Sequence, residues 1–476
     1  MPLSIQPINT LNNQDMKTMF KILFSALFLT ISSFINAGET PNLKVGILSD
    51  IHVSNEKSKE TFIKALDYFR TNDVDAVMIA GDLVEMGMDS ELQMVADAWY
   101  EVFPKDKGLK GKKITKLFVT GNHDIRGHTY KTVRKHFTEE EIQQHHINGQ
   151  KEVLWKKYFK EEYQPIYIKE VKGYTFIGAN FVNVKNVPGL ESFFASHEDQ
   201  IPSDKPFFYF QHVHPAGTCM SNAKDKDDGK STELLKRYSN LICFSGHSHT
   251  SLTDERTIWQ GEFTSVGTGS LKYTTLISDG HENGALPKEH NSQMSRINHN
   301  EAGHGMIMSV YDDRVELLRH EIKNDEDLGT WIIPLDVENR PYSFEKRAEE
   351  VPAPEFAANS SVRVSMKENG KDRQKNPVKQ MNVFFPGITS SDAHPRAFDF
   401  EVNVETMSQD TAAVVLTKKV FSRGAHLGEL IDTEIKSHCT FALSELPVGV
   451  PFRFVVYPMN CFGRKGKPIY SSIMTL

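Results

Sequence analysis

Short apolar runs recur between residues 43 and 335, and segments with helical periodicity separate them. Five of these runs lead directly into polar motifs, at residues 43–48, 76–80, 117–120, 207–210 and 241–244. Continuous apolar runs of this length are typical of strands that are buried on both faces of a sheet. Their alternation with amphipathic segments predicts a layered α/β domain over this part of the chain.

The segments between these runs predict helices and loops. Behind Ser54 and Asn55, either of which could cap a first turn, apolar residues recur at helical spacing. These residues are Phe62, Ile63, Leu66 and Phe69. An insertion at about residues 125–163 is rich in Lys, Glu and His and predicts a helical cap beside the polar motifs. A Gly-, His- and Asn-rich insertion at about residues 278–305 predicts a loop.

The character of the sequence changes after Leu335. Prolines and serines between residues 346 and 361 indicate a linker. Beyond the linker, apolar residues alternate with polar ones, as expected for strands with one buried face. The alternating residues are Phe398, Phe400, Val402 and Val404, and then Phe452, Phe454 and Val456. We predict a smaller all-β sandwich over residues 362–476, whose last stretch weakly resembles a fibronectin type III module.

Residues 1–37 have the pattern of a secretory signal peptide. Lys17 and Lys21 precede an apolar stretch at residues 22–31, and small residues lead to Ala37, after which we expect cleavage. A membrane span needs about 20 apolar residues, so this stretch is too short, and no later segment supplies a stable membrane span. A buried core helix would need a polar face, which the stretch lacks. The expected product is periplasmic or secreted, with its catalytic domain over residues 38–345.

Length and composition narrow the classes of function. A chain of 476 residues exceeds the size at which one hydrophobic core usually stops growing, so two domains are expected. The formal net charge of -7 gives no general attraction for a polyanion, so no long nucleic acid is expected as a substrate. Four cysteines are too few for a disulfide scaffold, although Cys439 and Cys461 could pair in an exported protein.

Each of the five apolar runs ends in residues that suit metal ions. The motifs are Asp50-Ile51-His52, Gly81-Asp82, Gly121-Asn122-His123-Asp124, the single His212, and Gly246-His247-Ser248-His249. Open α/β sheets build their sites beyond the carboxyl ends of strands, so these side chains are expected to meet. Carboxylate and amide oxygens together with imidazole nitrogens suit zinc, iron or manganese better than calcium.

In this order the motifs resemble the signature of the calcineurin-like metallophosphoesterase family, over about residues 43–335. Five short motifs in the correct order are far more specific than any one of them. The resemblance implies a layered α/β/β/α domain that holds two divalent metal ions. The ligands that it implies are Asp50, His52, Asp82 and His249 for one ion and Asp82, Asn122, His212 and His247 for the other.

The resemblance also implies a mechanism. A metal pair lowers the pKa of a bound water, supplies a metal-bound hydroxide as nucleophile near neutral pH and stabilises both oxygens of a phosphoryl displacement. In the family, the residue matching His123 faces the leaving oxygen as proton donor or charge stabiliser, and Asp124 could orient that imidazole. Purple acid phosphatases of the family have tyrosine where this chain has Glu85, so two divalent ions are favoured over a ferric centre.

Further residues are candidates for substrate binding. Arg126 and His128 lie in a basic stretch close to Asn122 and could bind a phosphate, although such a stretch is more often a solvated helix face. His214 follows His212 by two residues and is expected to support the ligands or to face the substrate. The turn at residues 267–270 resembles a small-residue turn behind the site of the family, but it could be only structural.

The sequence therefore predicts a metal-dependent phosphoric ester hydrolase with a phosphate-ester substrate. The two-metal core serves monoesters and diesters alike, so both substrate classes stay open. The alternative is an extracellular binding or adhesion protein with an inactive metallophosphoesterase-like domain. In either case the β-sandwich could contact a glycan or a protein. The complete set of ligand motifs favours the enzyme.

Overall fold

A computed structural model of the chain describes residues 39–219, 227–275, 302–371, 375, 377–388, 396–408, 411–422 and 437–476. The proposed signal peptide and most of the loop predicted at residues 278–305 lie outside the described residues. The chain divides into two compact units, Met1–Pro41 and Asn42–Leu476, and all elements below belong to the second. Within the described residues, no helix is both long enough and apolar enough to cross a bilayer.

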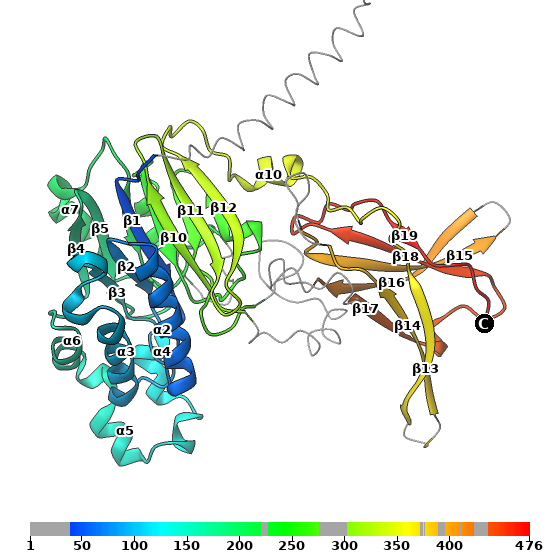
Figure 1. Ribbon diagram of the computed structural model, residues 1–476, viewed down its shortest axis with the longest axis horizontal. Helices are drawn as coiled ribbons and strands as arrows, with labels where there is room; N and C mark the ends of the chain where they lie inside the picture. The colour runs from blue at the N-terminus through cyan, green and yellow to red at the C-terminus, as the bar shows by residue number, and fades with distance from the viewer. Residues whose placement is uncertain are drawn as a thin grey trace, which may run out of the picture. The chain divides into compact units, whose positions relative to one another are not determined.

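Two six-stranded sheets form the first part of this unit (Figure 1). The first sheet has the order β12 (Glu326–Pro334), β11 (Arg314–Glu321), β10 (His304–Val310), β1 (Leu43–Leu48), β2 (Ala76–Ala80) and β3 (Thr115–Val119). The second has the order β4 (Ile166–Val171), β5 (Tyr174–Ala179), β6 (Phe207–Phe210), β7 (Leu241–Ser245), β9 (Thr264–Gly267) and β8 (Ile258–Gln260). Strands β1 to β3 are parallel, as are β5, β6, β7 and β9. Their carboxyl ends therefore gather at one edge of each sheet.

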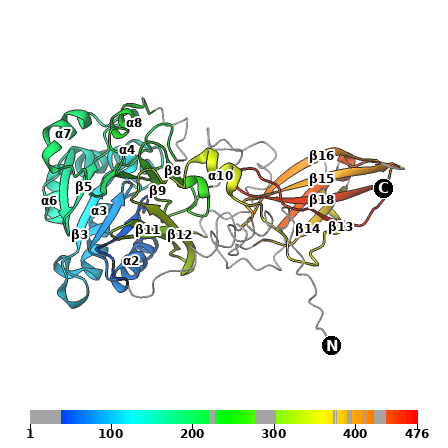
Figure 2. The ribbon, with the colours of Figure 1, turned by 90° about the horizontal axis from the view of Figure 1, so that it is seen from above.

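The helices cover the outer faces of the two sheets. Helices α2 (Glu56–Thr71), α3 (Asp89–Val102) and α6 (Lys151–Phe159) pack on the first sheet, where Phe62, Trp99 and Phe159 share a core with Val77 and Phe118. Helices α7 (Leu190–Ser196) and α8 (Lys230–Leu235) pack on the second sheet, on the side opposite α2 (Figure 2).

A second apolar core lies between the sheets. Val45 and Met78 of the first sheet contribute to it together with Phe208, Phe210 and Phe244 of the second. Each central strand is thus buried on both faces, which explains why its sequence is continuously apolar. The predicted layered α/β/β/α domain is confirmed.

Local sequence signals also account for the helices. Asn55 is one of the two predicted caps, and its Oδ1 accepts a hydrogen bond from the Ser58 amide at 3.1 Å. In turn, Ser58 Oγ accepts a hydrogen bond from the Asn55 amide at 3.1 Å. This reciprocal pair starts α2. The insertion predicted to be helical contains α4 (Asn122–Arg126), α5 (Glu139–His145) and α6, joined by short 3-10 turns. The sequence did not predict β4, β5 or the antiparallel strands β10 to β12.

The carboxy-terminal part is all-β, as predicted. Strands β13 (Arg363–Lys371), β14 (Pro377–Phe385) and β17 (Ser437–Ala442) form one antiparallel sheet, and β16 (Thr411–Phe421), β15 (Asp399–Ser408), β18 (Phe452–Met459) and β19 (Ile469–Tyr470) form another. Their shared core contains Phe385, Phe400, Val402, Phe441 and Phe454.

The segment between the two parts and the cysteines complete the description. Helix α10 (Phe344–Glu350) precedes an irregular stretch at residues 351–362, in the region where the sequence indicates a linker. Cys439 and Cys461 are both free thiols, as are Cys219 and Cys243, so the possible disulfide is not formed. Cys439 lies in β17, whereas Cys461 follows β18 of the other sheet.

The contact between α2 and β1 predicts a large stability change. Phe69 is fully buried, and its ring lies so close to Gly46 that a Cβ atom there would overlap it. Phe69→Ala should lower the free energy of unfolding by about 3–5 kcal/mol, because it leaves a cavity that the rigid sheet cannot fill. Chemical denaturation would measure the change. As a control, Val153→Ala, at a side chain 66% exposed, should stay within about 0.5 kcal/mol, and an equal loss would contradict the assignment.

Candidate metal centre

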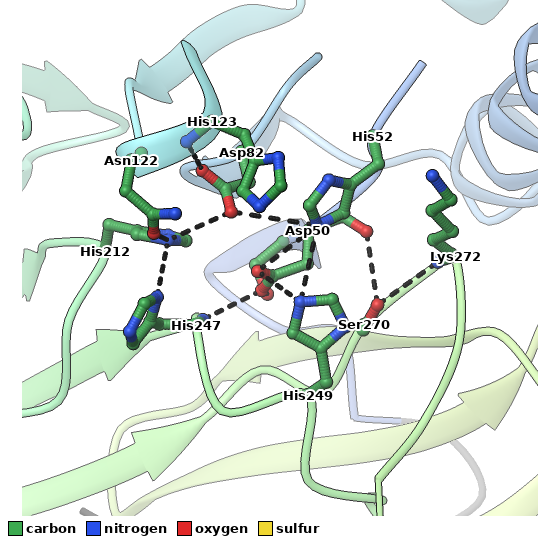
Figure 3. Close-up of polar contacts among 12 residues, drawn as sticks. Asp50, His52, Asp82, Asn122, His123, His212, His247, His249, Ser270 and Lys272 are labelled. Atoms are coloured by element: carbon green, nitrogen blue, oxygen red, sulfur yellow. Dashed lines mark hydrogen bonds and ion pairs between the residues drawn. The ribbon is translucent and has the colours of Figure 1, made fainter. Parts of the chain in front are cut away.

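The seven candidate ligands lie beyond the carboxyl ends of strands from both sheets (Figure 3). Asp50 and His52 follow β1, Asp82 follows β2, and Asn122 follows β3; in the second sheet, His212 follows β6, and His247 and His249 follow β7. Backbone hydrogen bonds join the two edges, from Leu271 N to Ser49 O at 3.2 Å and from Phe181 N to Thr120 O at 3.2 Å. The structure thus brings together residues that are almost 200 positions apart in sequence.

The backbone at the site is held in a conformation that ordinary residues avoid. Asp50, His52, Asp82, His247 and His249 all have left-handed φ angles, between 45° and 69°. Non-glycine residues in this region cost of order 1–3 kcal/mol each and persist where the surrounding structure imposes them. Five of the seven candidates carry this strain. Because the chain turns sharply at each of them, their side chains can converge on one small volume.

Glycines in three of the motifs leave room for the ligands. A Cβ atom on Gly81 would overlap the His212 ring, and one on Gly121 would overlap the Asp82 carboxylate. At Gly246, a Cβ atom would come within 2.5 Å of Asp50 Oδ2. The glycines in these motifs are therefore required by close packing around the ligands.

The two aspartates each keep one oxygen free to face the imidazoles. Asp50 Oδ2 accepts hydrogen bonds from Ser49 Oγ at 2.5 Å and from the His247 amide at 3.0 Å. Asp50 Oδ1 is buried, makes no hydrogen bond with the described residues, and lies 3.1 Å from His249 Nε2. Asp82 Oδ1 accepts from the His123 amide at 2.8 Å, which leaves Asp82 Oδ2 directed at the centre.

Imidazole nitrogens approach these free oxygens and one another. Asp82 Oδ2 lies 3.3 Å from His212 Nε2 and 3.7 Å from His52 Nε2, which is the placement expected of a bridging carboxylate. His52 Nε2 and His249 Nε2 are 3.3 Å apart, and His212 Nε2 lies 2.9 Å from Asn122 Oδ1. His247 Nδ1 lies 3.2 Å from His212 Nε2. Unprotonated nitrogens and oxygens at these distances repel, unless a cation or a proton lies between them.

The Nδ1 atoms of three histidine rings, on the side away from the centre, contact other groups of the protein. His212 Nδ1 lies 2.9 Å from the Ala80 carbonyl, and His249 Nδ1 lies 3.2 Å from the Tyr273 carbonyl. His52 Nδ1 lies 2.9 Å from Glu85 Oε2. Such contacts assign the proton to Nδ1 and leave the Nε2 lone pair for a metal.

The donor set fits two divalent cations. Three overlapping groups have ligand atoms within 4.8 Å of one another, namely Asp50, His52 and His249, then His52, Asp82 and His123, and finally Asp50, Asp82 and His212. Two of these groups contain Asp82, in keeping with a shared ligand. Asn122 and His247 adjoin His212, so they extend the group that contains Asp50, Asp82 and His212. Oxygen and imidazole donors without thiolate suit zinc, iron or manganese.

The pKa shifts at the centre also indicate that positive charge is favoured there. Burial acts to raise the pKa of Asp82, but the charge and hydrogen bond of His212 outweigh it and lower the pKa to about 2. Burial likewise acts to lower the pKa of His212, but Asp82 and Asp50 raise it to about 10. The pKa of His249 is also raised, by Asp50 against burial. The carboxylates thus attract protons to the imidazoles, and a divalent cation would satisfy the same charges.

His123 and Asp124 occupy different environments. His123 is 23% exposed, and its Nδ1 lies 2.7 Å from the Glu85 carbonyl, which leaves Nε2 available on the open side of the site. Asp124 is buried, and its carboxylate accepts backbone hydrogen bonds from Gly121 at 2.6 Å and Val84 at 2.9 Å. Burial and Asp82 raise the Asp124 pKa to about 7. The structure therefore gives Asp124 a role in holding two loops, and the Glu85 carbonyl holds the His123 ring.

The three candidates for substrate binding also differ. Arg126 is exposed, and its guanidinium lies 5.6 Å from the Phe181 ring. It can therefore reach solvent beside the ligand group that contains His212. His128 is half-buried and stacks on His146. His214 is buried, with Nδ1 2.6 Å from Ser245 Oγ and Nε2 2.9 Å from Ser248 Oγ. These contacts let His214 support the loop before His249, which is one of the two positions that the sequence left open.

Three residues that sequence reasoning did not assign to the centre lie against it. Glu85 contacts His52, and Lys272 Nζ lies 2.5 Å from the Glu85 carboxylate. The Tyr273 ring stacks on His249 with centroids 4.2 Å apart. The turn at residues 267–270 lies behind Asp50, whose carbonyl accepts a hydrogen bond from Ser270 Oγ at 3.2 Å (Figure 3). The position of Glu85, three residues after Asp82, was the only sequence signal for these contacts.

Part of the chain is similar to a known protein family. Residues 43–251 match the family model described as calcineurin-like phosphoesterase. No curated protein shows a significant match to the sequence.

Solved structures show more distant likenesses. A dimetal phosphatase from Danio rerio is 11% identical, with a TM-score of 0.34, and the match covers 62% of this chain and all of that one. A predicted phosphoesterase from Streptococcus pneumoniae is 12% identical, with a TM-score of 0.28, covering 61% and 97%. GAP50, the anchor in the inner membrane complex of Plasmodium, is 12% identical, with a TM-score of 0.36, covering 61% and 88%.

Because Gly246 packs closely against Asp50, we predict that a side chain at this position lowers the metal affinity. Gly246→Ala should weaken metal binding roughly ten- to a hundredfold, because the new Cβ atom displaces either Asp50 or the loop that carries His247 and His249. Titration with Mn²⁺ or Zn²⁺ would measure the change. Gly449→Ala is the matched control, since it also adds a methyl group but lies in the carboxy-terminal part with open space around it. Equal affinity in both variants would contradict the packing argument.

Proposed function

We propose that this protein hydrolyses phosphate esters with two divalent metal ions. The observation that carries the proposal is the convergence of free carboxylate oxygens and Nε2 atoms from two sheets, at Asp50, Asp82, His52, His212 and His249. Two cations held there would lower the pKa of water and stabilise negative charge on the ester oxygens. The chain needs no nucleophilic side chain for this chemistry.

The chain's own residues would position the cations and handle the proton. Asp82 would help to hold both cations, because one of its oxygens faces His52 and His212. We assign the leaving-group proton to His123 Nε2, since the Glu85 carbonyl already holds Nδ1 and the ring is partly exposed. Tyr130 supports this side of the site, with its ring 5.0 Å from that of His123 and its hydroxyl accepting a hydrogen bond from Asn122 Nδ2.

Our proposal for the class of metal ion rests on the donor set and on Glu85, which lies where purple acid phosphatases have tyrosine. Glu85 supplies no phenolate for ferric iron, so we propose two divalent ions drawn from manganese, iron and zinc. Monoesters and diesters both fit the proposal.

Metal loading with a substrate panel tests the function. Protein stripped with a chelator and reloaded with Mn²⁺, Zn²⁺ or Fe²⁺ should bind two ions per chain and hydrolyse at least one phosphate ester. The panel should include nucleotides, cyclic nucleotides and lipid head groups. His212→Ala should lose metal, whereas His197→Ala, which removes an imidazole stacked on Phe193, should not. A wild-type chain that binds no metal and cleaves no ester would favour the alternative of a binding protein.

A second experiment separates proton transfer from metal binding. His123→Ala should lower kcat roughly a hundred- to ten-thousandfold while both metals stay bound, because the imidazole acts on the leaving group. The metal content of the variant and its activity toward esters with good and poor leaving groups would measure this. The loss should be smallest for the ester with the best leaving group. A variant that loses metal would instead make His123 a ligand.

A further inference from the structure

The Glu85 carboxylate lies beside the proposed metal centre and has no assigned role there. We propose that Glu85 is a positioning residue, which orients the His52 ring and thereby sets the cation affinity of the site formed by Asp50, His52 and His249. This inference rests on the proposed two-metal function. It names a residue outside the ligand set and ties it to only one of the two ions.

The contact between Glu85 and His52 is the first ground. Glu85 Oε2 lies 2.9 Å from His52 Nδ1, on the side of the ring opposite the centre. The contact is short but not aligned as a regular hydrogen bond, so it is mainly electrostatic. A carboxylate at this nitrogen keeps the proton on Nδ1, raises the basicity of Nε2 and fixes the ring orientation. His52 Nε2 then faces Asp50 Oδ1 and Asp82 Oδ2 at 3.8 Å and 3.7 Å.

The Nδ1 contacts of His212 and His249 differ from that of His52. His212 and His249 direct Nδ1 at backbone carbonyls, which are neutral. Of these three rings, only His52 directs its Nδ1 atom at a charged side chain. A change of charge at Glu85 should therefore act on the site that contains His52, and much less on the site that contains His212.

The loop around Glu85 is built to hold it in place. On one side, Asp124 accepts hydrogen bonds from the Leu83 amide at 3.2 Å and the Val84 amide at 2.9 Å. On the other side, the buried Glu91 accepts from the Met86 amide at 3.0 Å and the Met88 amide at 3.2 Å. Two carboxylates thus fix the backbone before and after Glu85.

Lys272 holds the Glu85 side chain from the opposite direction. Its Nζ lies 2.5 Å from Glu85 Oε2, and both side chains are about one-third exposed, at 30% and 32%. Lys272 belongs to the turn beyond β9, where its amide donates to Ser270 Oγ at 3.2 Å. The Glu85 carboxylate therefore lies between a lysine from the second sheet and a histidine from the first.

Stepwise metal titration of two Glu85 variants tests the proposal. Glu85→Ala should weaken one of the two metal sites roughly ten- to a hundredfold and leave the other within about twofold. Glu85→Gln, which keeps the size and an acceptor oxygen but loses the charge, should fall between Glu85→Ala and the wild type. Competition with a chelating dye would give both dissociation constants without any activity measurement. Glu233→Ala is the matched control, because it removes an exposed glutamate paired with Lys236 on α8.

The outcomes separate this inference from the proposed function. If the wild type binds two ions and Glu85→Ala leaves both dissociation constants unchanged, the inference is wrong and the two-metal function stands. Equal weakening of both sites, with a lower apo unfolding temperature, would also overturn it and show a purely structural residue. A wild type without metal affinity would overturn the proposed function itself.

Discussion

The structure around the centre depends on two buried carboxylates, those of Asp50 and Asp82, whose free oxygens face imidazole nitrogens. Burying a carboxylate is costly unless a cation or several donors compensate its charge. Each aspartate accepts hydrogen bonds from backbone amides or a serine on one oxygen, and its other oxygen faces imidazole nitrogens. Three features keep those two oxygens and the Nε2 atoms together. They are the left-handed φ angles of the ligand residues, the glycines packed against the ligands, and the backbone carbonyls that contact the Nδ1 atoms.

This arrangement explains why much of the site could be predicted from the sequence. Strands buried on both faces have to be continuously apolar, and the carboxyl ends of parallel strands have to meet at one edge. A polar residue directly after such a run, as Asp50 or Asp82, is therefore placed by the fold before any contact is known. The apolar pattern also predicted a layered α/β domain and the first helix, with a cap at Ser54 or Asn55, whereas the α/β/β/α order came from the family resemblance.

The features of the fold and the site that the sequence did not predict depend on contacts that no local sequence pattern reveals. Strand β4 has mostly half-buried residues without a clear period, and β10 to β12 extend the first sheet from the far end of the domain. The sequence left two positions open for His214, beside the ligands or facing the substrate, and the contacts with Ser245 and Ser248 are visible only in the structure. Lys272 reaches Glu85 across 187 positions of sequence. Such long-range pairs are set by tertiary packing, so a single sequence does not show them.

The ligands come from two separate sheets, and this has a consequence for the apolar layer between them. Asp50, Asp82 and Asn122 move with the first sheet, whereas His212, His247 and His249 move with the second. The large side chains between the sheets, such as Met78, Phe208 and Phe244, therefore act as spacers that set the distance across the centre. Close-packed interiors transmit changes in volume rather than absorb them. The thickness of this apolar layer therefore helps to set the spacing of the candidate ligands, although its residues touch none of the atoms at the proposed centre.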